Sequence, residues 1–348
     1  MKLKIKKYLV ITALFSSTLY GQDIHFSQVQ ESPLWLNPAN AGLFNGYVRA
    51  IINYRSQWMS AGNPYKTMAL SVDGIAARQI KKRAYLGIGL MVFNDQAGPA
   101  KMGLTQLQTN FNGIVSITKK SKLAGAISAG FAQNKANLST LTYGNQFNGA
   151  EIDPNIASGE RIGNKSFSYI DLGAGLNYEY SNAASGLTRD DLFTFKMGAA
   201  VHHLNKPTQN FYLRSTYYLP MRFVGNMQAR MDFKGTKLSL LPSLVYLRQA
   251  SASEITIGTH LRYRFKNGTK VTGNSTEQGI NFGVYYRLND AIIPQLNVDL
   301  GKYAVGVSYD INVSKFTQVS RYNGGIELYL KYMVLGDALR KRKRDYNL

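Results

Sequence analysis

Few residues in this chain could do acid–base or metal chemistry, and their spacing assembles no site. Four histidines occur, His25, His202, His203 and His260, and there is no cysteine. None of the histidines belongs to an HExxH pair, and without thiolates the sequence predicts no metal centre. His202 and His203 are adjacent in an expected strand, so we expect them to point to opposite faces and share no ligand. We therefore expect no metal and no cofactor.

Other patterns that resemble catalytic motifs lack the surroundings that the chemistry requires. Ser128 lies in a Gly-Ala-Ile-Ser-Ala-Gly run, but its spacing differs from a nucleophile elbow and no helix follows. Asp190 and Asp191 precede an expected strand and fit turn chemistry better than an acid pair. His260 is better explained as a hydrogen-bonded interior residue than as a base. These residues predict a protein that is not an enzyme.

The chain begins with the features of a secretory signal peptide. Its first 21 residues combine a lysine-rich start, an apolar run over residues 8–15 and then small and polar residues. The apolar run is too short to span a bilayer as a helix. We expect cleavage near Gly21–Gln22 and export from the cytoplasm.

The chain is strongly basic even without this leader. Removing the four lysines of residues 1–21 lowers the formal charge from +21 to +17. An exported protein rarely meets nucleic acid, and the basic residues are dispersed apart from the run at 340–344, so we expect no nucleic-acid partner. Anionic lipid head groups or an acidic partner fit this charge better.

From residue 47 onward the dominant pattern is alternation of apolar and polar side chains. In residues 254–266, for example, apolar side chains occupy one face, and His260, Arg262 and Arg264 occupy the other. The segments are long enough for tilted strands that cross the hydrocarbon core, and aromatic residues recur at their ends. The second face mixes glycine, small residues and isolated arginines, which favours an enclosed interior over a soluble sandwich. Arg262 and Arg264 are therefore predicted to be basic residues that face the lumen.

Fourteen segments show this pattern, and an even number suits a bacterial single-chain barrel. We therefore predict an all-β, transmembrane, antiparallel up-and-down β-barrel of about 14 strands. The expected strands are residues 47–55, 66–73, 84–94, 104–118, 122–134, 167–181, 192–204, 222–233, 237–248, 254–265, 278–288, 292–300, 303–311 and 324–333.

The connections predict which end of the barrel faces outward. With the N-terminus inside, the short links near residues 119–121, 234–236 and 301–302 fall on the periplasmic side, and the long ones, 135–166 and 205–221, fall outside. Two links depart from this rule: 266–277 is long on the inner side, and the link near 289–290 is short on the outer side. The expected organisation is a signal peptide (1–21), a periplasmic or lumenal segment (22–46), the barrel (47–333) and a basic tail (334–348).

The stretch from Gln22 to Trp58 separates an irregular lead-in from the first strand. Its first half is rich in turns and amides and is predicted to pack in or under the barrel. Both tryptophans of the chain, Trp35 and Trp58, lie in this stretch, where they pack at an interface or anchor a protein contact. Arg49 and Arg55 share the inward face of the first strand and could hold the irregular segment through charge-assisted hydrogen bonds.

Short sequence motifs near the two ends of the chain resemble those of a known family. QDIHFSQ (22–28), LNPANAG (36–42), NYRSQW (53–58) and the closing Asn-Gly-Gly-Ile-Glu (323–327) are similar to the signature of the PorP/SprF family, outer-membrane proteins of the type IX secretion system. The resemblance covers the mature chain and implies no catalytic residue. It nominates structural or interaction residues: Gln22, Phe26, Asn37, Pro38, Arg55 and Trp58.

This resemblance implies an integral outer-membrane barrel of Bacteroidota that serves type IX secretion or gliding. Its expected partners are a secreted cargo protein or adhesin, periplasmic components of the system or a peptidoglycan-associated protein, and outer-membrane lipid. Our hypothesis is a non-enzymatic barrel that helps to secrete a protein cargo or anchors it at the cell surface. The alternatives are a diffusion porin or hydrophobic-substrate transporter, in which Arg262 and Arg264 would set anion preference, and a surface-binding protein that acts through the 135–166 loop.

Overall fold

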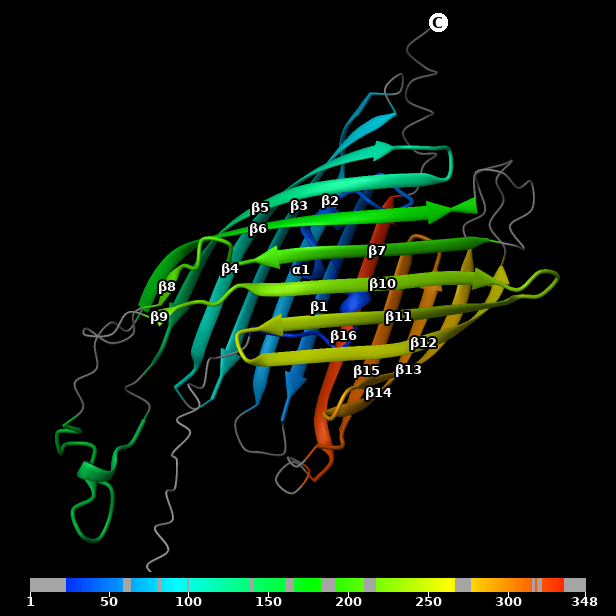
Figure 1. Ribbon diagram of the computed structural model, residues 1–348. Helices are drawn as coiled ribbons and strands as arrows, with labels where there is room; N and C mark the ends of the chain where they lie inside the picture. The colour runs from blue at the N-terminus through cyan, green and yellow to red at the C-terminus, as the bar shows by residue number, and fades with distance from the viewer. Residues whose placement is uncertain are drawn as a thin grey trace, which may run out of the picture.

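The computed structural model shows a barrel of tilted strands around an N-terminal segment (Figure 1). It describes residues 23–58, 64–79, 83–98, 100–137, 141–159, 166–182, 192–209, 217–266, 277–314, 317 and 321–334. The predicted signal peptide, Gln22 and nearly all of the predicted basic tail lie outside these ranges. No helix within them has the length and apolar character needed to cross a bilayer.

Fourteen strands form one closed antiparallel barrel, which confirms the predicted fold. They are β1 (Val48–Gln57), β2 (Tyr65–Gln79), β3 (Ala84–Ala97), β4 (Met102–Ser116), β5 (Ser121–Lys135), β6 (Ser166–Ser181), β7 (Phe193–His202), β10 (Arg222–Asp232), β11 (Leu238–Gln249), β12 (Ala252–Lys266), β13 (Gln278–Arg287), β14 (Ala291–Leu300), β15 (Tyr303–Asn312) and β16 (Asn323–Val334). Two further strands, β8 (Thr208–Gln209) and β9 (Tyr217–Tyr218), form a small hairpin outside the barrel sheet.

Each barrel strand pairs with the strands before and after it in the chain, and the first strand closes the barrel against the last. The closing pair runs antiparallel from Val48 opposite Val334 to Gln57 opposite Gly325. Closure leaves the barrel sheet without an open side, as a membrane-spanning sheet requires.

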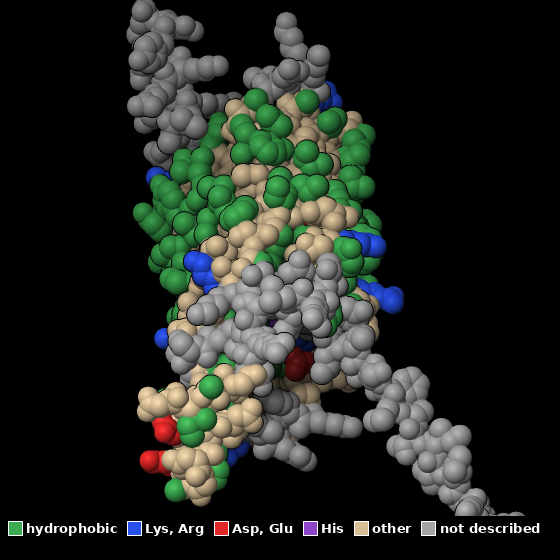
Figure 2. All heavy atoms as spheres, turned by 90° about the vertical axis from the view of Figure 1, so that its left-hand side faces the viewer, with side chains coloured by type: hydrophobic (Ala, Val, Ile, Leu, Met, Phe, Trp, Pro, Cys, Tyr) green, Lys and Arg blue, Asp and Glu red, His purple; other side chains and the backbone are tan. Residues whose placement is uncertain are grey.

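The alternation in sequence becomes an apolar outer wall and a polar inner wall. Along β13, Phe282 and Val284 are 57% and 61% exposed, whereas Tyr285 and Arg287 are 1% and 2% exposed. Hydrophobic side chains gather over the outer wall in the space-filling view (Figure 2). This pattern is the reverse of a soluble protein and suits a barrel whose outside meets lipid.

The two ends of the barrel differ in their connections. One end, called the long-loop end, carries the connections 136–165 and 203–221; the opposite short-turn end carries the turns 117–120, 233–237 and 301–302. At the long-loop end β6 extends past β7, because their pairing begins only at Ala174 opposite Val201. There the Asn205 side chain donates to the carbonyl of Ile170 and accepts from the amide of Leu172, at 2.6 and 3.1 Å.

The described chain begins with an irregular segment inside the barrel. It contains three short helices, η1 (Val29–Glu31), α1 (Pro33–Leu36) and η2 (Pro38–Asn40). Proline starts both α1 and η2, where its missing N–H costs no hydrogen bond. We call residues 23–46 the plug segment; it lies within the ring of strands in Figure 1.

Candidate functional site: the N-terminal segment inside the barrel

The plug segment runs the length of the lumen, from the long-loop end to the short-turn end. Its first described residue, Asp23, accepts from His203 at 2.6 Å and donates its backbone N–H to Gln249 at 2.9 Å, both beside the long-loop end. Near its other end, the carbonyl of Leu43 accepts from Lys196 at 3.2 Å, close to the short-turn end of β7. The chain thus crosses the interior once before it enters β1.

An aromatic pair forms the apolar anchor of the plug segment. Phe26 and Trp35 are 1% and 2% exposed, and their rings meet edge to face with centroids 5.7 Å apart. The guanidinium of Arg222 lies 4.3 Å from the Trp35 ring centroid and donates to the Trp35 carbonyl at 3.2 Å. Val224 and Val245 of the barrel wall belong to the same buried cluster. The aromatic pair therefore fixes the plug segment to β10 and β11.

Asn37 and Pro38 form a turn that fits against β6 and β7. The Asn37 side chain accepts from the backbone of Ala39 at 2.9 Å and donates to the carbonyl of Leu176 at 3.0 Å. A Cβ on Gly175 would lie 2.1 Å from the Asn37 side-chain oxygen, so a larger residue at this position of β6 would displace the Asn37 side chain. Asn37 is fully buried, which makes both hydrogen bonds costly to lose.

Side chains of β2 and β4 hold the backbone that follows. The Asn112 side chain donates to the carbonyls of Ala39 and Ala41, both at 2.8 Å. The Asp73 carboxylate accepts from the backbone N–H of Gly42 at 2.9 Å and from Arg49 at 2.9 Å. Arg49, predicted to hold the irregular segment, therefore lies beside it and acts mainly through Asp73.

Arg55 of β1 lies in a buried ionic cluster. It donates to Asp310 at 2.9 Å, to Glu327 at 3.3 Å and to the hydroxyl of Ser27 at 2.5 Å, and it lies 3.1 Å from the imidazole of His25. Burial and the positive charge of Arg55 lower the pKa of His25 well below its ordinary value, which keeps the imidazole neutral.

Glu327 of the last strand completes this cluster from the opposite side of the closing pair. Its carboxylate accepts from the backbone N–H groups of Ser27 and Gln28, at 2.6 and 3.1 Å. The Gln28 side chain donates in turn to the Glu327 carbonyl at 3.2 Å. Strands β1 and β16, which are far apart in sequence, therefore both bind the plug segment at Ser27.

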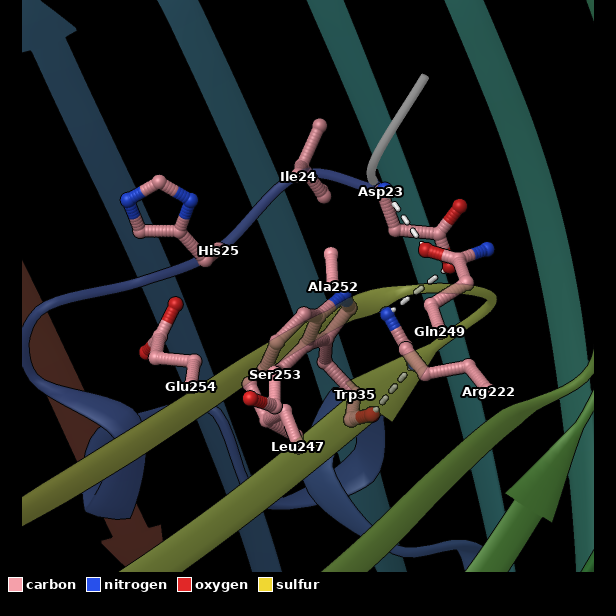
Figure 3. Close-up of a pocket in the computed structure, with 10 residues that line it drawn as sticks. All are labelled: Asp23, Ile24, His25, Trp35, Arg222, Leu247, Gln249, Ala252, Ser253 and Glu254. Atoms are coloured by element: carbon pink, nitrogen blue, oxygen red, sulfur yellow. Dashed lines mark hydrogen bonds and ion pairs between the residues drawn. The ribbon is translucent and has the colours of Figure 1, made fainter. Parts of the chain in front are cut away.

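A second ionic cluster holds the plug segment at the long-loop end, and Figure 3 shows two of its members, Asp23 and Arg222. The imidazole of His203 lies 2.6 Å from Asp23 and 2.8 Å from Asp171, and Arg222 lies 3.1 Å from Asp23. Burial opposes the charge on His203, but the two carboxylates overcome it and raise its pKa to about 9. Burial alone would raise the pKa of Asp23, but the positive charges of His203 and Arg222 hold this pKa far below its ordinary value.

The prediction that His202 and His203 face opposite sides is wrong. Strand β7 ends at His202, and His203 takes a left-handed backbone conformation with φ of +58°. Both side chains consequently lie inside, 2% and 4% exposed, with ring centroids 6.4 Å apart. Strict alternation holds only while the strand continues, so it could not apply to the second histidine.

Arg262 and Arg264 lie inside the barrel, and acidic side chains compensate both. Arg262 donates to Glu277 at 2.9 Å and also bonds Asp299, while Arg264 donates to Asp232 at 2.9 Å. Their side chains are only 9% and 1% exposed. Arginines paired in this way present little free positive charge to a passing anion.

The remaining nominated residues lie at the rim or inside the wall. Trp58 follows β1 at the long-loop end, where its ring packs edge-on against Tyr65 with centroids 4.9 Å apart. His260 lies between Tyr285 and Asn297, at 3.0 and 3.2 Å, as a hydrogen-bonded interior residue. Ser128 is on the inner face of β5. Gln22, Asp190 and Asp191 lie outside the described residues. Within the described ranges, no group of three or more His, Asp or Glu side chains could hold a metal ion.

Sequence reasoning did not find the wall residues that hold the plug segment. Asp73, Asn112, Arg222, Asp310 and Glu327 are dispersed over five strands, and each looks like any other inward polar residue. Their signal was their position on the predicted interior face and, for Glu327, its place in the closing motif 323–327.

Several cavities lie beside the plug segment inside the barrel. At the long-loop end, two small ones of about 40 and 20 Å³ border Asp23 and Trp35. Two larger ones, about 210 and 270 Å³, lie toward the short-turn end. Figure 3 shows how Asp23, Trp35 and Arg222 crowd the first of these.

Fold and site together define a class: a membrane β-barrel whose own N-terminal segment occupies its lumen. Residues 18–332 match the family described as type IX secretion system membrane protein PorP/SprF. The chain belongs to this family.

Several solved structures are similar to this chain. The chain is 10% identical to the CymD monoaromatic hydrocarbon channel, covering 88% of this chain and 93% of that one with a TM-score of 0.43. It is 11% identical to the P. putida toluene transporter TodX, covering 86% and 93% with a TM-score of 0.46. It is 9% identical to a Pseudomonas aeruginosa FadL homologue, covering 87% and 94% with a TM-score of 0.47. No curated protein matches the chain.

Proposed function

We propose that this protein is a non-enzymatic outer-membrane barrel of the type IX secretion system that helps to secrete a protein cargo or anchors it at the cell surface. Its membership of a type IX secretion membrane protein family supports this role. The long-loop end would face the exterior and the short-turn end the periplasm, as is usual for outer-membrane barrels. An adhesin-like cargo, periplasmic components of the system and outer-membrane lipid would be its partners.

The observation that carries the proposal is the occupied lumen. The plug segment joins its backbone to Asp73, Asn112 and Glu327 of the wall, and its aromatic pair is fully buried. A solute would have to displace these contacts to pass. An occupied lumen would obstruct the solute flow that a diffusion porin requires. A barrel that anchors a protein requires a rigid structure but no open channel.

The proposal is tested by deleting the gene and comparing the proteins at the cell surface with those in the medium. A cargo role predicts that one or more large surface proteins leave the surface, and either appear in the medium or remain inside the cell. Complementation with the full chain should restore them. An unchanged distribution of surface and medium proteins would contradict the proposal.

A second candidate function is surface binding through the connection after β5. Within its described part, residues 141–159, Phe147 and Ile152 form an isolated β-bridge and are 56% and 48% exposed. This part of the connection stands away from the barrel in Figure 1. The β-bridge brings these two exposed apolar side chains onto one small surface, which would suit a protein contact. Replacing residues 141–159 by a short Gly-Ser linker should abolish surface binding under this function and leave secretion intact.

A further inference from the structure

Two cavities flank the plug segment where it leaves the lumen at the short-turn end. Cavity A, about 210 Å³, is bordered by Phe44, Tyr85, Ile114 and Lys122. Cavity B, about 270 Å³, is bordered by residues of η1 and of eight barrel strands, among them Lys196. Their combined volume lies within the roughly 300–1,000 Å³ of an ordinary ligand site.

The plug segment separates the two cavities, together with the ion pairs that link Lys122 and Lys196 through Glu179. The Arg49 guanidinium, on the cavity B side, lies 4.4 Å from the Phe44 ring centroid on the cavity A side. Glu179 joins Lys122 of cavity A to Lys196 of cavity B, with both ion-pair distances at 2.9 Å. One ligand that reaches over this boundary could therefore contact both cavities.

In three ion pairs along this side, the cation is the more accessible partner. The Lys122 and Lys196 side chains are 40% and 22% exposed, whereas their common partner Glu179 is 11% exposed. Arg230 is 20% exposed over an Asp232 side chain that is fully buried. In two other pairs that border cavity B, the acid is slightly more exposed: Asp299 at 19% against Arg262 at 9%, and Glu31 at 18% against Lys331 at 15%. Around Lys122, Lys196 and Arg230, however, the acids lie behind the cations, so this part of the mouth presents positive charge.

The rim around the cavities adds charge of the same sign. Among the residues described at the short-turn end, no acidic side chain is exposed, since each is buried or half-buried against a cation. The turns and strand ends there carry six exposed lysines: Lys119, Lys120, Lys234, Lys237, Lys266 and Lys302. Such a mouth attracts an anionic partner before contact is made.

We propose that cavities A and B form a docking site for an acidic polypeptide segment that carries a large apolar side chain. Its carboxylates would meet Lys122, Lys196 and Arg230, and its apolar side chain would enter cavity A beside Phe44 and Tyr85. A polypeptide fits better than a lipid head group because these three cations belong to the inner wall, whereas lipid meets the outer wall. The placement of this site in the periplasm rests on the proposed function; the binding itself does not.

The test uses the full chain in nanodiscs of zwitterionic phosphatidylcholine and a fluorescent peptide of about ten residues, all glutamate except one central phenylalanine. The variant Lys122→Gln/Arg230→Gln removes two accessible cations but leaves Glu179 with Lys196 and leaves Asp232 with Arg264. We expect its Kd for the peptide to rise about tenfold or more. Raising the salt from about 0.15 M to about 1 M should also weaken binding, because the Debye length falls from about 8 to about 3 Å.

Matched controls separate docking from general attraction to a basic protein. The variant Lys101→Gln/Lys206→Gln removes the same charge from exposed lysines at the long-loop end and should leave the Kd unchanged. Replacing phenylalanine by alanine in the peptide should weaken binding to the wild type, which tests cavity A without altering the protein. A peptide with lysine in place of glutamate should not bind.

Three results would overturn the proposal. The first is no binding of the glutamate peptide at low salt, and the second is equal loss of affinity in both double variants. The third is displacement of the peptide by inorganic phosphate or by phosphatidylglycerol nanodiscs with the same dependence on Lys122 and Arg230, which would assign the site to a phosphate group. Each result is independent of whether gene deletion releases a surface protein, so the docking site and the proposed function can fail separately.

Discussion

Replacing Gly87 by alanine is expected to displace the plug segment where its backbone turns toward β1. A Cβ on Gly87 would lie 2.1 Å from the carbonyl oxygen of Ala41, more than 1 Å inside the roughly 3.3 Å at which carbon and oxygen normally touch. The obstacle is backbone, so no side-chain rotation relieves it. Gly42, next in the chain, has φ of +69° and approaches Gly87 closely, which leaves the turn little freedom to move.

The cost of this substitution follows from the contacts that must shift. Overpacking alone costs about 1–3 kcal/mol. Moving Ala41 and Gly42 also strains the bond from Asn112, worth about 1 kcal/mol net, and the charged bond to Asp73, worth about 1.5–3 kcal/mol. Because these terms overlap, we expect Gly87→Ala to lower the free energy of unfolding by about 3–6 kcal/mol.

The matched control is Gly113→Ala on the outer face of β4, where a Cβ would lie 3.8 Å from its only close neighbour. Both variants are compared with the wild type by thermal unfolding in detergent and by current across planar bilayers. Gly87→Ala should unfold earlier and show intermittent current, whereas Gly113→Ala should stay within about 0.5 kcal/mol of the wild type. If the two variants behave alike in both assays, the close packing of the plug segment against β3 is refuted.

Three further changes probe the same interior. Arg55→Met should lower the free energy of unfolding in urea by about 3–5 kcal/mol, because Glu327 and Asp310 lose a buried cation; a loss below about 1 kcal/mol would contradict this. The pKa of His203, about 9, exceeds its ordinary value of 6.5, so its charge stabilises the fold fully below about pH 6.5 and this contribution is lost as the pH rises through 9. His203→Asn should therefore flatten the decline in melting temperature between pH 7 and pH 10, and an unchanged slope would show that the charge adds nothing. Deleting residues 23–46 should produce a steady current in planar bilayers that the wild type lacks, and an equal current through the wild type would identify a porin.

The alternation of apolar and polar side chains predicted most of the fold. Each of the fourteen predicted segments overlaps one barrel strand, because an inside–outside period of two is a local property that does not depend on the neighbouring strand. The largest error is in β2, predicted to end at residue 73 but continuing to Gln79. Its pairing with β3 shifts between Ile75 and Ala77, and such an irregularity breaks the alternation that marks a strand.

The character of the plug segment was also visible in the sequence, but its path was not. Prolines and amides between Gln22 and Gly42 predicted an irregular segment in or under the barrel, and Arg49 and Arg55 were expected to face it. Nothing in the sequence indicated that the segment crosses the whole lumen, with Asp23 at the long-loop end. That follows from contacts with residues of later strands.

By itself, the sequence determined which side chains face lipid and which face the interior, and it marked the ends of most strands. The tertiary structure alone decided which interior residues meet. Arg55 and Asp310 are 255 positions apart and meet because β1 closes the barrel against β16, which pairs with β15. Ser27 and Glu327 are 300 positions apart and meet because the plug segment lies inside that barrel. The periodicity of one strand sets the direction of its side chains, whereas the register and closure of all fourteen strands set their partners.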